Sequence, residues 1–124
     1  MRLILTGASG LLGGYLLREC LRRGEEVVAW SGRQQGELFG CPLRPTDLAD
    51  PDAITSAFHD ARPKCILHTA ALAAVSDCYR DPYRAEQINT RGSAVLAELA
   101  DRAKIPLVHV STDLVFDGQH APYR

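Results

Sequence analysis

Three glycines near the N-terminus carry the clearest chemical signal in this sequence. Gly7, Gly10 and Gly13 are spaced three residues apart, between the apolar run Arg2–Thr6 and a helical pattern. A strand that ends in such a turn brings backbone N–H groups and a helix N-terminus close to an anion, because glycine has no Cβ to block the approach. The spacing favours a site for the pyrophosphate of a dinucleotide, and a tight turn without a ligand is the alternative.

We expect the whole turn to contact such a cofactor. Gly7 allows the chain to turn sharply off the strand, Gly10 lets the phosphate approach the backbone, and Gly13 lets the helix lie close to the strand. The cofactor-binding residues predicted from this turn are Gly7, Ser9, Gly10, Leu11, Leu12 and Gly13.

The residues after the second apolar run, Glu26–Trp30, bear on which dinucleotide is bound. An acidic residue there would bind the ribose 2′-OH of NAD, whereas an arginine would pair with the 2′-phosphate of NADP. The run is followed by Ser31 and Arg33, and no carboxylate occurs before Glu37. The sequence therefore predicts NADP(H) in preference to NAD(H), with Ser31 and Arg33 beside the cofactor. The alternative is that Arg33 is a solvated loop residue.

Two further segments are candidates for the cofactor site. Asp47 could accept a hydrogen bond from the adenine amino group, with Leu48 beside the ring, or Asp47 could simply cap a turn. Ala70, Ala71 and Leu72 follow another apolar run, and their small or apolar side chains would let a ligand lie across the strand end. We therefore add all five residues to the predicted cofactor site.

The elements that must position these residues alternate along the chain. Alternating strands and helices predict an α/β fold with a doubly wound, Rossmann-like parallel sheet, strand order 3-2-1-4-5, and a ligand crevice at the carboxyl ends of strands one and four. Residues 1–124 would form one such domain. The predicted strands are Arg2–Thr6, Glu26–Trp30, a weak Cys41–Leu43, Lys64–Thr69 and Ile105–Val110. The predicted helices are Leu11–Arg23, Pro51–Pro63 and Tyr83–Lys104, with loops at Ser31–Gly40 and Ala70–Pro82 and an irregular tail, Ser111–Arg124.

Bulk properties exclude several classes of protein. With 46% hydrophobic and 23% charged residues, the chain can bury a core. A formal net charge of −1 gives no field that would attract nucleic acid or an anionic membrane. The four cysteines and four histidines lack metal-ligand spacing, so we expect no metal site. No secretory signal or membrane-spanning run is visible, and we expect a cytoplasmic protein.

Several segments carry a family resemblance that covers essentially the whole chain. Thr6–Gly13 resembles the glycine motif of the extended short-chain dehydrogenase/reductase superfamily. The run Val110–Gly118, followed by Ala-Pro-Tyr, is similar to the strand-five signature of the dTDP-4-dehydrorhamnose reductase group within that superfamily. Three further segments resemble the middle region of the same group: His68–Ala71, Val75–Cys78 and Ile88–Thr90.

The resemblance implies roles for residues near the end of the chain. Thr112 would occupy the catalytic Ser/Thr position and hydrogen-bond the substrate carbonyl or hydroxyl. Asn89 would hold the active-site backbone, and Leu114 departs from the group, which usually has Tyr there. The resemblance also places Asn89 and Ser111 in the cofactor site, and Thr112, Asp113, Val115 and Phe116 beside the substrate.

One expected feature of the superfamily is missing. Its chemistry depends on a Tyr and a Lys four residues apart, but the residues four positions before Lys64 and Lys104 are Asp60 and Ala100. We therefore expect the chain to be the N-terminal part of a longer protein, inactive alone and lacking the C-terminal strands and the substrate subdomain. The apolar edge of the last strand would be unpaired. A short natural protein whose partner covers this edge is the alternative.

The implied function is NADPH-dependent reduction of a keto group on a nucleotide-activated sugar, with this chain supplying the cofactor-binding part. The nucleotide sugar would be the partner molecule, and a homodimer of the longer form is one option. Two alternatives stay open. One is a non-catalytic regulatory subunit that binds NADP or a sugar nucleotide, and the other is a sugar-nucleotide epimerase or dehydratase.

Overall fold

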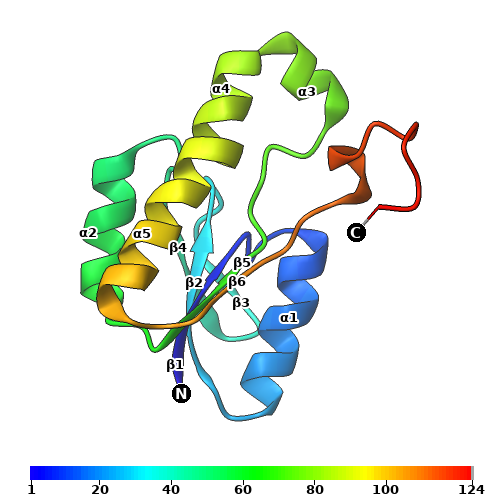
Figure 1. The fold of residues 1–124 in the computed structure, drawn as a ribbon. Coiled ribbons are helices and arrows are strands. Elements are labelled where there is room, and N and C mark those ends of the chain that lie inside the picture. Colours follow the sequence, from blue (N-terminus) through cyan, green and yellow to red (C-terminus); the bar gives the residue numbers. More distant parts are fainter. Residues whose placement is uncertain (124) are drawn as a thin grey trace.

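A six-stranded sheet with helices on both faces forms the protein (Figure 1). The structure is a computed structural model that describes residues 1–123. The helix α1 covers one face of the sheet, and α2 and α5 cover the other. The elements are β1 (Arg2–Thr6), α1 (Leu11–Arg22), β2 (Glu26–Ser31), β3 (Glu37–Leu38), β4 (Cys41–Pro45), α2 (Pro51–Ala61), β5 (Cys65–His68), α3 (Val75–Arg80), α4 (Pro82–Glu86), a π-helical turn (Gln87–Gly92), α5 (Ser93–Ala103), β6 (Leu107–His109) and a 3-10 turn (Asp113–Val115).

The sheet has the order β3-β4-β2-β1-β5-β6. Its five parallel strands, β4, β2, β1, β5 and β6, confirm the predicted order 3-2-1-4-5. The strand β3 was not expected, because the residue types of Ser31–Gly40 predict a loop. It pairs antiparallel with β4 through a tight turn in which Phe39 and Gly40 both have positive φ, 53° and 75°. Hairpin turns of this kind usually carry Asn-Gly or Asp-Gly, so Phe-Gly gave no signal.

The central strand β1 divides the core into two layers because its side chains alternate between the two faces. Ile4 packs with Phe58 of α2 and Leu96 of α5. Its neighbours Leu3 and Leu5 pack on the other face with the layer that contains Leu17 of α1. This buried core fixes the carboxyl ends of the strands, from which the candidate site is built.

The segment between β5 and α5 departs most from prediction. Val75–Arg80 forms α3, although a loop was predicted over Ala70–Pro82. The helix predicted over Tyr83–Lys104 is present, but Gln87–Gly92 forms a π-helical turn within it. Gly92 packs against β4's exit, where an added Cβ would lie 2.5 Å from the Leu48 carbonyl oxygen. In Figure 1, α3 and α4 stand above the carboxyl edge of the sheet.

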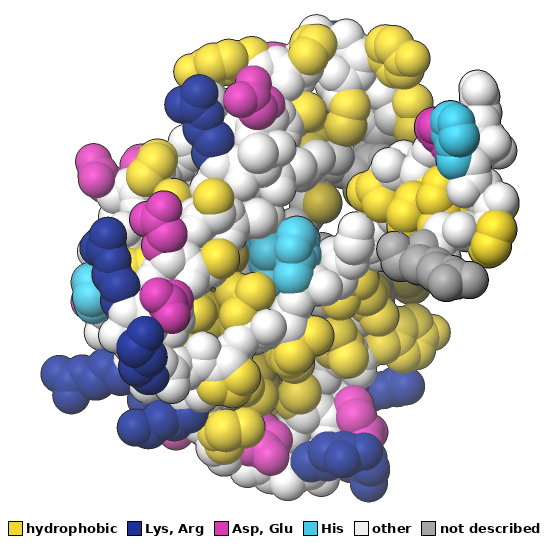
Figure 2. All heavy atoms as spheres, viewed as in Figure 1, with side chains coloured by type: hydrophobic (Ala, Val, Ile, Leu, Met, Phe, Trp, Pro, Cys, Tyr) yellow, Lys and Arg dark blue, Asp and Glu magenta, His cyan; other side chains and the backbone are white. Residues whose placement is uncertain are grey.

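The sheet ends at β6, which pairs with β5 and with no other strand among residues 1–123. Val108 is 55% exposed, and Val110 just after the strand is also exposed. Figure 2 shows hydrophobic side chains gathered on this face, over β6 and α1. The expected apolar edge is therefore present. None of the helices formed by residues 1–123 has the length and hydrophobicity needed to cross a bilayer.

Candidate functional site

A cavity of about 780 Å³ lies at the carboxyl ends of β1, β2, β4 and β5. This is the place where ligands bind in open parallel α/β sheets, at the point where the strand order reverses. Most of the predicted cofactor residues line it together: Gly7, Ser9, Gly10, Ser31, Arg33, Asp47, Leu48, Ala70, Ala71 and Leu72.

The glycine turn is close-packed in a way that excludes side chains. Gly7 has φ +68°, and an added Cβ there would lie 2.8 Å from the Thr69 hydroxyl oxygen at the exit of β5. Gly10 donates its N–H to the Gly7 carbonyl at 2.9 Å. An added Cβ at Gly13 would lie 1.8 Å from the same carbonyl oxygen. The turn, the start of α1 and the exit of β5 can therefore meet only because these positions are glycine.

The N-terminus of α1 is left without a side-chain cap. Its N-cap residue is Gly10, and its first turn holds no acidic residue. The helix α2 shows the usual arrangement instead, because the Asp50 carboxylate accepts from Asp52 N at 3.0 Å and Ala53 N at 3.2 Å. The first-turn N–H groups and the positive end of α1 therefore remain available to an anion. This cradle fits a pyrophosphate.

The exit of β2 presents a cation to the cavity. The Ser31 hydroxyl donates to the Gln34 carbonyl at 2.5 Å, so it holds the turn that contains Arg33. Arg33 is exposed, lines the cavity and makes no ion pair with any carboxylate of residues 1–123. A guanidinium in this position suits a phosphate better than a ribose hydroxyl.

Asp47 and Leu48 follow β4 at the same edge. The Asp47 carboxylate accepts from Ala49 N at 2.9 Å, so it caps a turn, as the alternative interpretation proposed. The guanidinium of Arg84 lies 3.9 Å from the same carboxylate oxygen. Leu48 is only 8% exposed and belongs to the core while also lining the cavity.

A buried network fixes the floor between β1 and β5. The Thr6 hydroxyl accepts from Thr69 N and Ala70 N, both at 3.1 Å. Both lone pairs of the Thr6 hydroxyl oxygen are then used, so the hydroxyl donates its hydrogen bond to His68 Nδ1 at 2.7 Å. His68 is therefore neutral with its proton on Nε2, from which it donates to the Ser93 hydroxyl at 2.8 Å. The network ties the exits of both strands to α5.

The charge state of His68 agrees with this assignment. The side chain is fully buried, and burial is the main cause that lowers its pKa, which falls to about 4. The His109 ring, stacked on it at 4.8 Å between centroids, is the second and smaller cause of this lowering. A protonated His68 would lose the bond from Thr6, since both ring nitrogens would then be donors.

Asn89 clamps the loop after β5 from behind. Its side-chain oxygen accepts from Leu72 N at 2.8 Å, and its side-chain nitrogen donates to Leu72 O at 3.1 Å. Asn89 does not line the cavity itself, so its position fits the backbone-holding role that the resemblance implies.

Replacing Asn89 with alanine removes both bonds to Leu72 at once. We expect the free energy of unfolding to fall by about 1–3 kcal/mol, since two backbone groups lose their partner. Urea denaturation measures this change. Thr90→Ala, which alters the exposed neighbour in the same π-helical turn, is the matched control. Equal stability of both variants would contradict the clamp.

The structure does not bring every predicted residue to the cavity. Leu11 and Leu12 are exposed and Gly13 is buried under the turn, so the lining includes none of the three. The predicted residues Ser111, Thr112, Asp113, Val115 and Phe116 lie on an exposed segment that does not line the cavity either. The Thr112 hydroxyl donates to the Asp113 carboxylate at 3.2 Å and accepts from Leu114 N at 3.3 Å.

Some lining residues were missed by sequence reasoning. They are Thr6, Trp30, Gly32, Thr46, Asp77, Arg80, Asp81, Arg84 and Ile88. The signal for α4 was available, because Asp81-Pro82 repeats the Asp50-Pro51 pattern that starts α2. The Asp81 carboxylate accepts from Arg84 N at 3.0 Å, as an N-cap does.

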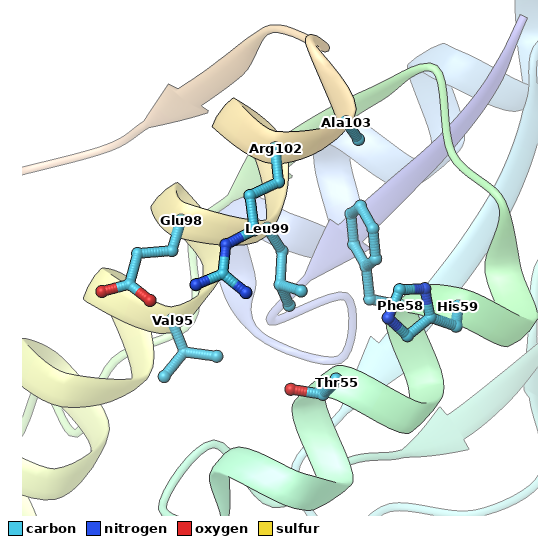
Figure 3. Close-up of a pocket in the computed structure, with 8 residues that line it drawn as sticks. All are labelled: Thr55, Phe58, His59, Val95, Glu98, Leu99, Arg102 and Ala103. Carbon is cyan, nitrogen blue, oxygen red and sulfur yellow. The ribbon is translucent and has the colours of Figure 1, made fainter.

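A second hollow of about 360 Å³ lies between α2 and α5 (Figure 3). Its lining includes Phe58 and His59 from α2 and Leu99 and Arg102 from α5, and none of the predicted site residues. It is a groove between two packed helices, away from the glycine turn. Residues 1–123 hold no cluster of three or more His, Cys, Asp or Glu side chains arranged for a metal ion.

Comparison with known proteins settles the family. The RmlD substrate binding domain family matches residues 1–124. The chain belongs to this family. The match confirms the resemblance to the dTDP-4-dehydrorhamnose reductase group that the sequence motifs indicated.

Relatives of this RmlD-type chain carry different names. A probable low-salt glycan biosynthesis reductase of Haloferax volcanii is 33% identical over 96% of the chain, which spans 39% of that protein. Methionine adenosyltransferase 2 subunit beta of Pongo abelii is 32% identical over 99% of the chain and 36% of its own length. A dTDP-4-dehydrorhamnose reductase of Sinorhizobium fredii is 34% identical over 99% of the chain, which spans 38% of that protein. The chain thus spans less than two fifths of each.

Solved structures agree with the fold. A hypothetical dTDP-4-dehydrorhamnose reductase from Sulfolobus tokodaii superposes with a TM-score of 0.83 at 31% identity, covering 100% of the RmlD-type chain and 44% of that protein. A UDP-glucose 4-epimerase of Thermus thermophilus in complex with NAD superposes with a TM-score of 0.79 at 31% identity. The match covers 90% of the RmlD-type chain and 38% of that protein. The Rossmann-like α/β fold is therefore shared with both reductases and epimerases.

Proposed function

We propose that this chain is the NADP(H)-binding part of a reductase that acts on a keto group of a nucleotide-activated sugar. The observation that carries the proposal is the cavity at the strand ends, which joins an uncapped helix N-terminus to the guanidinium of Arg33. The first suits a pyrophosphate, and the second suits a 2′-phosphate. The names of the reductase relatives supply the substrate class.

Each part of the cavity then has a task. The glycine turn and the first residues of α1, Leu11 and Leu12, would bind the pyrophosphate through backbone N–H groups. Asp47 and Leu48 would flank the adenine. The ribose and nicotinamide would lie along Ala70, Ala71 and Leu72, with Asn89 and Ser111 supporting that end.

The bound cofactor would supply a hydride to the substrate. Thr112 would hydrogen-bond the substrate oxygen, beside Asp113, Val115 and Phe116. To do so, the Thr112 hydroxyl would turn away from the Asp113 carboxylate. The sequence offers no Tyr and Lys four residues apart as the proton donor. We therefore expect cofactor binding by this chain, and turnover only by a protein that adds that pair.

The test of the cofactor assignment is Arg33→Ala. We expect affinity for NADPH to fall roughly 10- to 100-fold, because a charge-assisted contact with the 2′-phosphate is lost, while affinity for NADH changes little. Isothermal titration of the two cofactors measures both. Arg102→Ala, an exposed arginine on α5 outside the cavity, is the matched control. Equal losses for NADPH and NADH would refute the role of Arg33.

A second candidate is a non-catalytic binding subunit. The observation that favours it is the 32% identical relative named as the beta subunit of a methionine adenosyltransferase. The two candidates differ in turnover. Steady oxidation of NADPH with a 4-keto sugar nucleotide, by a protein that contains this chain, would support the reductase, and NADPH binding without turnover would support the subunit.

A further inference from the structure

The wall formed by α3 and α4 carries two arginines that the proposed function leaves without a role. Arg80 ends α3 and Arg84 lies in α4, and both line the cavity. Arg80 is committed to its own helix, where its guanidinium lies 3.5 Å from the Asp77 carboxylate. Arg84 instead reaches across to a residue of a different element.

Arg84 reaches the corner of the cavity formed by the exits of β4 and β2. Its guanidinium lies 3.9 Å from the carboxylate of Asp47, the second residue after β4. The exits of β4 and β2 are neighbours, since Thr46 N donates to the Ser31 carbonyl at 2.8 Å. Arg33 follows two residues after Ser31. The neighbouring exits of β4 and β2 therefore bring Asp47, with Arg84 beside it, and Arg33 to the same edge of the cavity.

The partner that Arg84 has in the free protein is a weak one. At 3.9 Å the ion pair is long, and the two side chains are 39% and 54% exposed, so solvent screens it. The Asp47 oxygen concerned already accepts from Ala49 N. A guanidinium has five N–H donors, and a phosphate that carries about two negative charges offers them a stronger acceptor.

We propose that Arg84 is a second phosphate-binding arginine, which grips the 2′-phosphate of NADP(H) together with Arg33. In the free protein the Asp47 carboxylate holds Arg84 toward this corner. On binding, the phosphate takes over its guanidinium. This inference rests on the proposed function, because it needs an adenosine 2′-phosphate in the cavity.

The experiment compares two fragments that lack the nicotinamide and therefore need no catalysis. Adenosine 2′,5′-bisphosphate and 5′-AMP differ only in the 2′-phosphate, so the ratio of their dissociation constants isolates that group. Arg84→Gln is expected to reduce the preference for the bisphosphate by about tenfold, while 5′-AMP binding is kept. Arg80→Gln removes the same charge from the same wall and is expected to leave the ratio nearly unchanged.

Each outcome decides the inference. An unchanged ratio in Arg84→Gln, or equal losses in Arg84→Gln and Arg80→Gln, would overturn it, because the effect would then be absent or a general effect of charge. If Arg84→Gln binds neither fragment, Arg84→Lys replaces it, and a reduced ratio there supports the paired contact while an unchanged ratio overturns it. Failure of the proposed function looks different, since the unaltered protein would then either show no preference for the bisphosphate over 5′-AMP or bind neither fragment.

Discussion

Replacing Gly13 with alanine is expected to cause a large loss of stability and of dinucleotide binding. The added Cβ would lie 1.8 Å from the Gly7 carbonyl oxygen and 2.6 Å from its carbon, and both are backbone atoms that cannot rotate away. Either α1 moves off the sheet or the turn opens. Overpacking in a rigid core costs about 1–3 kcal/mol and more in severe cases, and we expect at least the upper value here. Urea denaturation and NADPH titration measure the two losses.

The next residue supplies the control. Gly14 lies in the same helix, but an added Cβ there would meet its nearest atom, the Ala8 carbonyl oxygen, at 3.8 Å. Gly14→Ala is expected to raise stability by about 0.5–1 kcal/mol, since alanine is the better helix former. If the two alanine variants proved equally stable, the close contact between α1 and the glycine turn would be wrong.

Acidification is expected to destabilise the protein through His68. The folded protein keeps His68 neutral down to its lowered pKa of about 4, whereas in the unfolded chain the imidazole takes up a proton below its ordinary value of 6.5. Between these two pH values the unfolded state binds more protons, so the free energy of unfolding falls as pH falls. Above pH 6.5 the contribution is fully present. The total loss at pH 4 is at most about 3 kcal/mol.

The variant His68→Asn separates this effect from the titration of carboxylates. The asparagine carbonyl can still accept from Thr6, but it cannot be protonated in this range, so the slope of stability between pH 6.5 and pH 4 should flatten. His59→Asn, at an exposed position on α2, should keep the slope of the unaltered protein. Chemical denaturation at several pH values gives the slopes. Parallel slopes for all three proteins would refute a neutral, buried His68.

Local patterns predicted most of the fold. Apolar runs and the Asp50-Pro51 start marked the five parallel strands and α2, because burial on both sheet faces and helix capping leave direct traces in sequence. The strand β3 left none, because its turn uses Phe39 and its pairing depends on β4. The helix α3 left none either, since none of its residues is buried and it has no side-chain cap.

The candidate site was predictable where the backbone conformation requires a particular residue type or where a residue directly follows a strand. The glycine spacing identified the turn after β1, and Arg33 could be read from its position after β2. The bond from Thr6 to His68 joins residues 62 positions apart, and Arg84 faces Asp47 only because α4 stands over the sheet. Such pairings are properties of the folded chain, and no local spacing encodes them.

The network around Thr6 also determines which parts of the cavity lose conformational entropy when a ligand binds. The amides of Thr69 and Ala70 are already held by a buried hydroxyl, so the floor of the cavity is preorganised and loses little freedom on association. The opposite wall is different, because neither α3 nor α4 contains a buried residue. Because no side chain of α3 or α4 is packed into the core, we expect substitutions within these helices to change ligand affinity without disturbing the sheet.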